Sequence, residues 1–63
     1  MSELPENYER VLEEARRKRI LSPVRFGCMK EKIAAVLKGE SFDEFEGWTP
    51  EQAQQLQNDL DQQ

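Results

Sequence analysis

Few residue types in this 63-residue chain could support catalysis. The chain has no histidine and one cysteine, Cys28, so nucleophilic triads that rely on a histidine base are absent and a zinc site is not expected. Carboxylates offer pairs at helical spacing, such as Glu9 with Glu13. General acid–base catalysis by such pairs needs a walled cleft that shifts their pKa values, and a chain this short encloses little volume. We therefore expect no enzymatic activity, no metal and no cofactor.

The single cysteine has three interpretations: a small core residue, a reactive thiol, or one half of a disulfide that links two copies of the chain. A free cysteine usually behaves as a small buried hydrophobic residue, which is the role we expect for Cys28. An exposed Cys28 would instead be a reactive thiol, favoured by the nearby basic residues Arg25 and Lys32. One cysteine excludes an internal disulfide and is typical of a reducing, cytoplasmic location.

Charge is strongly segregated along the chain, although the formal net charge is only −4. Residues 1–14 have five acidic and one basic side chain, and residues 15–38 have one acidic and eight basic side chains. Residues 39–63 have seven acidic side chains and no basic one. Either these segments face one another within the fold, or the chain presents a basic or acidic surface to a partner of opposite charge.

A basic patch is the first candidate surface. Phosphates attract such clusters regardless of nucleic-acid sequence, through counterion release. Nucleic-acid-binding domains are usually basic overall, however, whereas this chain is acidic. Direct contact with nucleic acid is therefore an alternative function. The patch consists of Arg16, Arg17, Lys18, Arg19 and Arg25.

An aromatic, acidic segment is the second candidate surface. Its three aromatic residues lie three apart and alternate with carboxylates, a pattern that either closes a small core or docks into a basic, apolar groove. A role in the core is the stronger interpretation, because a domain of this size needs its large side chains to close a core. Our functional hypothesis is that this segment also carries part of a partner-binding surface, because aromatic residues, tryptophan above all, dominate interface energetics. The candidate contact residues are Phe42, Phe45, Trp48, Leu56 and Leu60.

Apolar residues recur at helical spacing, and no stretch is typical of a strand. A first helix is predicted at about residues 5–19, with Pro5 in its first turn and acidic residues near its start. A second is predicted at 23–38, with Ser22 as its N-cap and Gly39 after its end.

The second helix has apolar residues on two sides. The main side carries Met29 and Ile33, and the opposite side a narrow stripe of Val24, Cys28 and Ala35. A helix of this kind usually packs between others, which predicts a central position. Within it, Gly27 indicates either a close neighbour or a later helix start.

A one-turn helix is predicted near residues 42–46, where Ser41 and Glu44 match a capping box. The third helix is predicted at 50–60, with a capping box of Thr49 and Gln52. Its apolar face is thin, and aspartates near its end oppose the helix dipole. We therefore expect the C-terminal turn to fray.

These patterns predict one small all-α domain over residues 1–63, with three helices and a one-turn helix. The expected function is a cytoplasmic, non-enzymatic protein–protein interaction module: an adaptor, regulator or inhibitor of a larger protein. The alternatives are a nucleic-acid-associated regulator using residues 16–38 and a structural homo-oligomer. No apolar run reaches the roughly 20 residues that a membrane span requires, so no membrane partner is expected.

Overall fold

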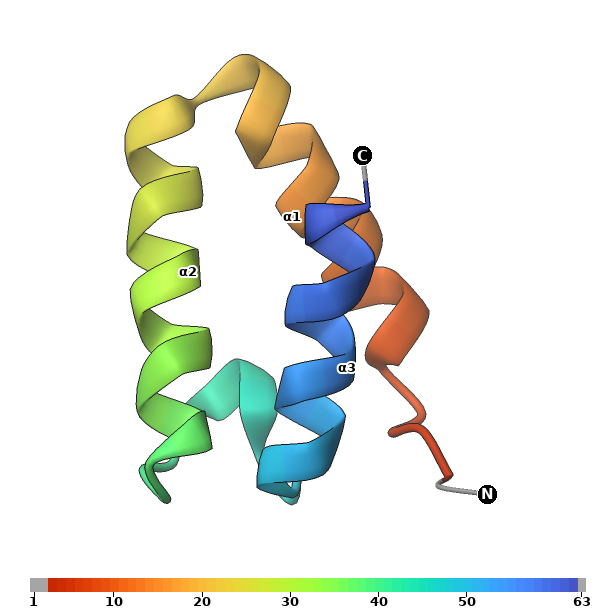
Figure 1. Cartoon of the computed structure of the whole chain (residues 1–63). Coiled ribbons are helices and arrows are strands. Elements are labelled where there is room, and N and C mark those ends of the chain that lie inside the picture. The colour runs from red at the N-terminus through yellow and green to blue at the C-terminus, as the bar shows by residue number, and fades with distance from the viewer. Residues whose placement is uncertain (1–2, 63) are drawn as a thin grey trace.

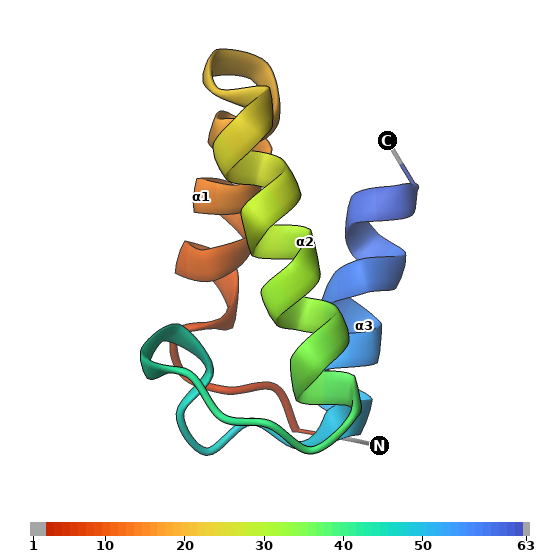
Figure 2. The same ribbon diagram turned by 90° about the vertical axis from the view of Figure 1, so that its left-hand side faces the viewer.

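The computed structural model describes residues 3–62, which contain three α-helices, one 3-10 turn and no strand. The all-α prediction is confirmed. Helices α1 and α2 form an antiparallel hairpin, and α3 packs against both of them (Figure 1). Figure 2 shows α2 crossing in front between α1 and α3, with the segment around η1 at the end of the molecule opposite to the hairpin turn. The elements are α1 (Tyr8–Leu21), α2 (Pro23–Leu37), η1 (Asp43–Phe45) and α3 (Pro50–Asp61).

Helix α1 begins and ends later than predicted. Its first helical residue is Tyr8, whose N–H donates to the Pro5 carbonyl at 3.0 Å across a preceding turn. It then continues to Leu21 and stops at Ser22, which adopts φ −150°. Proline disfavours helical geometry in the residue before it, so Pro23 limits α1 to the residues before Ser22. The end of α1 therefore includes two exposed apolar residues, Ile20 and Leu21, that lie beyond the predicted helix.

Gly39 follows α2 with a φ of 101°, as predicted for its C-terminal cap. Of the three predicted N-terminal caps, only one forms through a side-chain hydrogen bond. At the start of α3, the Gln52 N–H donates to Thr49 Oγ1 at 3.2 Å and the Thr49 N–H donates to Gln52 Oε1 at 2.8 Å, which confirms that capping box. The Ser22 side chain makes no capping bond, and η1 is preceded by Phe42 without a side-chain cap. Ser22 is nevertheless the N-cap residue of α2, with Pro23 at the first helical position, as predicted. The prediction of a Ser41 capping box is wrong.

The hydrophobic core lies between the three helices and η1. It contains the main apolar faces of all three helices, so the principal face predicted for α2 is confirmed at Met29 and Ile33. Phe45 and Ile33 are among its largest fully buried side chains. The core residues are Tyr8, Val11, Ala15, Met29, Ile33, Val36, Phe45, Trp48, Ala53, Leu56 and Leu60.

Helix α2 touches both other helices, but it does so with one face only. Because α1 and α3 also contact each other, the core closes on a single side of α2. Val24 and Cys28, on the stripe predicted to pack against a neighbour, are exposed. Gly27 likewise has open space around it, although it lies within the helix. The prediction of two packed sides, and of a buried Cys28, is therefore wrong.

The thin apolar face of α3 is fully used, since Ala53, Leu56 and Leu60 are all buried. Two side chains of α1 also hold its last turns: the Arg19 guanidinium donates to the Leu60 carbonyl at 2.9 Å, and the Tyr8 hydroxyl donates to Asp59. Fraying of the final turn stays a prediction. No helix in residues 3–62 has both the length and the apolar character to cross a bilayer.

Candidate partner-binding surface

The aromatic segment lies mostly inside the protein. The Trp48 ring stacks on Tyr8 with centroids 5.7 Å apart and meets the edge of Phe45 at 4.9 Å. Leu56 and Leu60 are buried beside them. Four of the five residues that we assigned to partner contact are therefore core residues, because a chain this small needs its large side chains to close a core.

One polar residue, Asn7, fixes this aromatic cluster to the start of α1. Trp48 Nε1 donates to Asn7 Oδ1 at 3.0 Å, and Asn7 Nδ2 donates to the Glu44 carbonyl at 2.9 Å. The side chain thereby satisfies a buried indole N–H and a loop carbonyl at once. Buried polar atoms are stable only when they are paired in this way, and none of those in residues 3–62 lacks a partner.

Phe42 is the one candidate of the aromatic segment that stays partly exposed. Its ring lies 5.9 Å from Lys32 Nζ, which also forms an ion pair with Glu44 at 3.0 Å. These contacts hold the connection between α2 and η1 against the helix. Phe42 therefore packs against Lys32 on one side and is partly exposed to solvent on the other. The exposed area of one such side chain is small compared with that of a protein–protein interface.

The structure divides the basic patch into three parts. Arg19 faces α3 and lies 5.6 Å from the Phe26 ring, so it acts within the fold. Arg16 lines a separate hollow on α1 with Leu12. The other three residues, Arg17, Lys18 and Arg25, converge beside Leu21 and Ser22 on a hollow of about 250 Å³. We call these three residues the cationic rim.

Charge segregation is only partly neutralised within the fold. In residues 3–62 the ion pairs are Lys32–Glu44, which links α2 to η1, and Lys18–Glu14 at 3.5 Å, which lies within α1. Arg17 and Arg25 therefore have no carboxylate partner among the described residues. A surface with unpaired cations remains at the end of the molecule where α1 meets α2.

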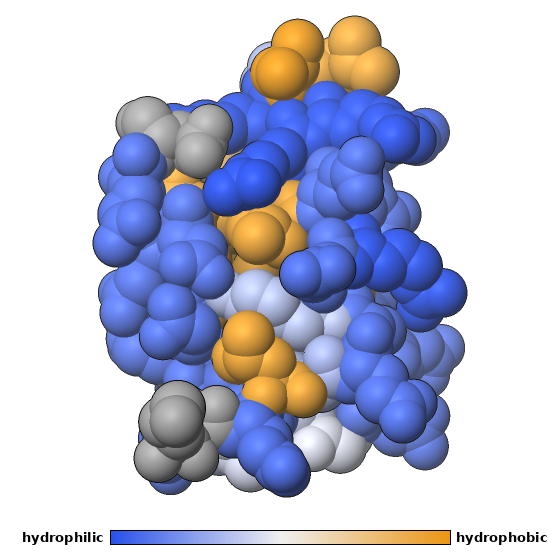
Figure 3. Space-filling view, turned by 90° about the vertical axis from the view of Figure 1, so that its right-hand side faces the viewer, coloured by the Kyte–Doolittle hydropathy of each residue, from blue (hydrophilic) through white to orange (hydrophobic). Residues whose placement is uncertain are grey.

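Three large aliphatic side chains project from that same end. Ile20, Leu21 and Val24 are 78%, 74% and 79% exposed, and we call them the hairpin tip. Figure 3 shows hydrophobic atoms standing above a band of hydrophilic ones at the end where α1 and α2 meet in Figure 1. The exposed Cys28 follows Val24 by one helical turn, so the apolar surface extends along α2.

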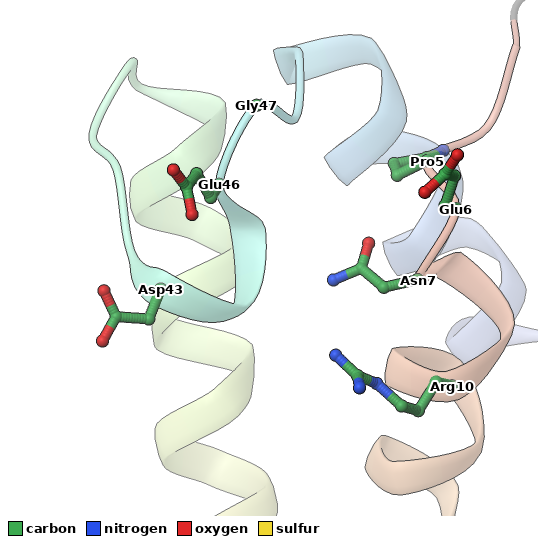
Figure 4. A pocket seen from close by; sticks show the side chains of 7 residues that line it. All are labelled: Pro5, Glu6, Asn7, Arg10, Asp43, Glu46 and Gly47. Carbon is green, nitrogen blue, oxygen red and sulfur yellow. The ribbon is translucent and has the colours of Figure 1, made fainter.

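The opposite end of the molecule carries a third hollow, which is polar and has a volume of about 490 Å³ (Figure 4). Asn7 and Arg10 reach from α1 toward the η1 connection, whereas the Asp43 side chain points away from α1. The acidic residues Glu6 and Glu46 also line this hollow. Among residues 3–62, no group of three or more histidine, cysteine, aspartate or glutamate side chains is arranged to hold a metal ion.

Comparison with protein families, with curated proteins and with solved structures gives no match for this chain. The assignment of a functional site therefore depends on the chain's own geometry. On that basis the hairpin tip with its cationic rim is the strongest candidate.

We did not predict Ile20 and Leu21 as residues of the binding surface, nor the hydrogen bonds by which Asn7 holds the aromatic segment. A signal for the tip was available: Ile20-Leu21 stands immediately before Ser22-Pro23, where the chain must leave the helix. Adjacent helical residues point about 100° apart, so at least one of two aliphatic residues at such a break points away from the centre of a core. For Asn7 there was no local signal, because its partners lie 37 and 41 residues away.

Proposed function

We propose that this chain is a non-enzymatic protein–protein interaction module that holds its partner at the hairpin tip. The observation that carries the proposal is the exposure of three neighbouring aliphatic side chains in a chain that has few to spare. Only four large hydrophobic side chains are exposed in residues 3–62, and three of them form the tip; the fourth is Leu4. Clustered exposed apolar residues rimmed by polar ones are typical of interaction sites.

The energetics favour a protein partner. Full burial of one such aliphatic side chain is worth about 1.5–3 kcal/mol, so covering three of them offsets much of the cost of association. Nucleic acid would bind this surface weakly, because phosphates gain binding free energy from cations and the centre of the surface is apolar. We also place this binding in the cytoplasm, since an exposed, single thiol such as Cys28 stays reduced there.

The native cysteine allows the proposal to be tested without a new attachment site. A maleimide-linked photo-crosslinker placed on Cys28 lies one helical turn from Val24, at the edge of the proposed surface. The labelled chain is irradiated in lysate of cells that express it, and adducts are resolved by mass. The same experiment is run on Leu21→Ser and, as a matched control, on Leu4→Ser, an exposed leucine outside the tip.

We expect a discrete protein adduct that falls at least about fivefold in Leu21→Ser and is retained in Leu4→Ser, since burial of one leucine supplies that much affinity. Circular dichroism should show both variants folded. Equal adducts in both variants, or none in the parent, would contradict the proposal. An adduct with twice the chain's own mass would instead favour the homo-oligomer, and a nuclease-sensitive one the nucleic-acid regulator.

A further inference from the structure

We infer that the partner of the hairpin tip is an acidic protein surface: the apolar face of an amphipathic helix bordered by carboxylates. This inference rests on the proposed function and adds the chemistry of the partner. Three independent features of the structure support it: the side chains that stay unpaired at the tip, its position at one end of the molecule, and the mixed charge around it.

Some cations of the chain are used within the fold, whereas five others form no ion pair and lie over no aromatic ring in residues 3–62, and two of these five, Arg17 and Arg25, line the hollow beside Leu21. The other three are Arg10, Arg16 and Lys38. Arg19, Lys30 and Lys32 each lie over an aromatic ring, and Arg19 and Lys32 also form hydrogen bonds with α3 or with Glu44. An unpaired guanidinium beside an apolar surface is suited to a carboxylate that arrives with an apolar partner.

The position of the tip determines which elements of this chain that partner contacts. The tip is where the chain turns from α1 to α2, at one end of a molecule whose longest dimension is 31 Å (Figures 1 and 3). Residues Ile20 and Leu21 come from α1 and Val24 from α2, so the partner must contact both arms of the hairpin.

Charge also orients the encounter. Asp43 and Glu46, which form no ion pair in residues 3–62, lie in and beside η1 at the end opposite to the tip (Figure 1). An acidic partner is therefore repelled from that end and attracted to the cationic rim, which favours a single docking orientation.

The charge around the tip is mixed, which favours a protein over a uniformly anionic surface. Glu14 lines the same hollow as the cationic rim and pairs with Lys18. A phosphate backbone or an anionic bilayer would repel this carboxylate, whereas a protein surface can offer it a hydrogen-bond donor. The tip also lacks the tryptophan and tyrosine residues that anchor proteins at a membrane interface.

The inference is tested with defined probes and the purified full chain. The first probe is a labelled amphipathic helical peptide of about 20 residues, with leucines on one face and glutamates on the other. A permuted peptide of the same composition lacks the apolar face. Short duplex DNA and phosphatidylcholine–phosphatidylserine vesicles are the competing probes, and binding is measured by fluorescence anisotropy and by co-sedimentation.

Matched variants separate the rim from net charge. Arg17→Gln/Arg25→Gln removes two rim cations, and Arg10→Gln/Lys38→Gln removes two exposed cations elsewhere, so both carry the same net charge. We expect the rim variant to bind the amphipathic peptide about tenfold more weakly and the control variant to stay within about twofold of the parent. The permuted peptide should bind the parent at least about fivefold more weakly than the amphipathic one.

Equal losses in the two variants, equal binding of the two peptides, or preferential binding of DNA or vesicles would overturn the inference. The proposed function is tested by a different experiment. It would still hold after such results if the Cys28 adduct were reduced by Leu21→Ser and retained in Leu4→Ser. In that case the partner is a protein with a neutral or basic surface.

Discussion

The two ends of this molecule use their hydrophobic residues in opposite ways. At one end, the connection between α2 and α3 places Phe45 and Trp48 in the core and is tied to α1 by Asn7. At the other end, the turn between α1 and α2 leaves three aliphatic side chains open to solvent. The connection over residues 38–49 contains aromatic residues, and the turn at Ser22 is flanked by aliphatic ones, yet only the first set of residues contributes to the core.

This difference separates stability from recognition. A domain of this size has a marginal core, so apolar residues that a fold leaves exposed gain nothing for its stability. The aromatic connection looked like the binding surface in the sequence because tryptophan and phenylalanine dominate interfaces. The structure shows that these residues already have partners within the chain, and that the hairpin tip does not.

The largest expected effect comes from breaking the core. Ile33 is 1% exposed, and Ile33→Asp would bury a carboxylate among apolar side chains with no partner. We expect this variant to lose its cooperative thermal transition, followed by far-ultraviolet circular dichroism. An unchanged melt would contradict the position of α2 in the core.

A smaller loss of stability is expected when the two hydrogen bonds of the Asn7 side chain are removed. Asn7→Ala leaves the Trp48 indole N–H and the Glu44 carbonyl without their partners, which should cost about 1–3 kcal/mol in the free energy of unfolding. Urea unfolding measures the difference. The matched control is Asn58→Ala, because Asn58 is exposed and its side chain accepts only from Gln54. If both variants lose the same stability, the aromatic connection is not held by Asn7.

The pH dependence of stability tests the contact between α1 and α3. Burial of Tyr8, together with its hydrogen bond to Asp59 and the charge of that carboxylate, raises the pKa of Tyr8 above its usual value of 10.0. The folded state therefore keeps this proton when the unfolded state releases it. The contribution is complete below about pH 10 and is lost as the pH rises further.

We expect the parent to lose more stability than Tyr8→Phe between about pH 8 and about pH 11, in urea unfolding. The variant itself should cost about 1 kcal/mol at neutral pH, because it removes one hydrogen bond. Only the difference between the two slopes is informative, because it cancels the contributions of all groups that the two proteins share. Parallel slopes would contradict a buried, hydrogen-bonded Tyr8.

The smallest effect on stability is expected at the hairpin tip. Leu21→Ser and Val24→Ser should change the free energy of unfolding by less than about 0.5 kcal/mol, since both side chains are exposed. The same urea titration measures this. A loss comparable to that of Asn7→Ala would mean that the tip contributes to folding, which would remove the contrast between the two ends.

Much of the fold could be predicted from the sequence, because its signals are local. The 3.6-residue period identifies the faces of Met29 and Ile33 in α2, and the Thr49–Gln52 capping box defines the start of α3. The site could not be predicted in the same way. Periodicity shows that Val24 and Cys28 share a face, but whether a neighbour covers that face depends on how three helices are arranged.

The most direct test of the central claim is a map of where a partner binds. Amide chemical shifts of the isotope-labelled chain are followed by nuclear magnetic resonance during titration with the acidic amphipathic peptide. The account predicts that the largest changes fall in residues 17–28, around Leu21 and Val24, while residues 42–60 shift little. The largest changes in residues 42–60, with residues 17–28 unaffected, would contradict it and return the binding surface to the aromatic segment.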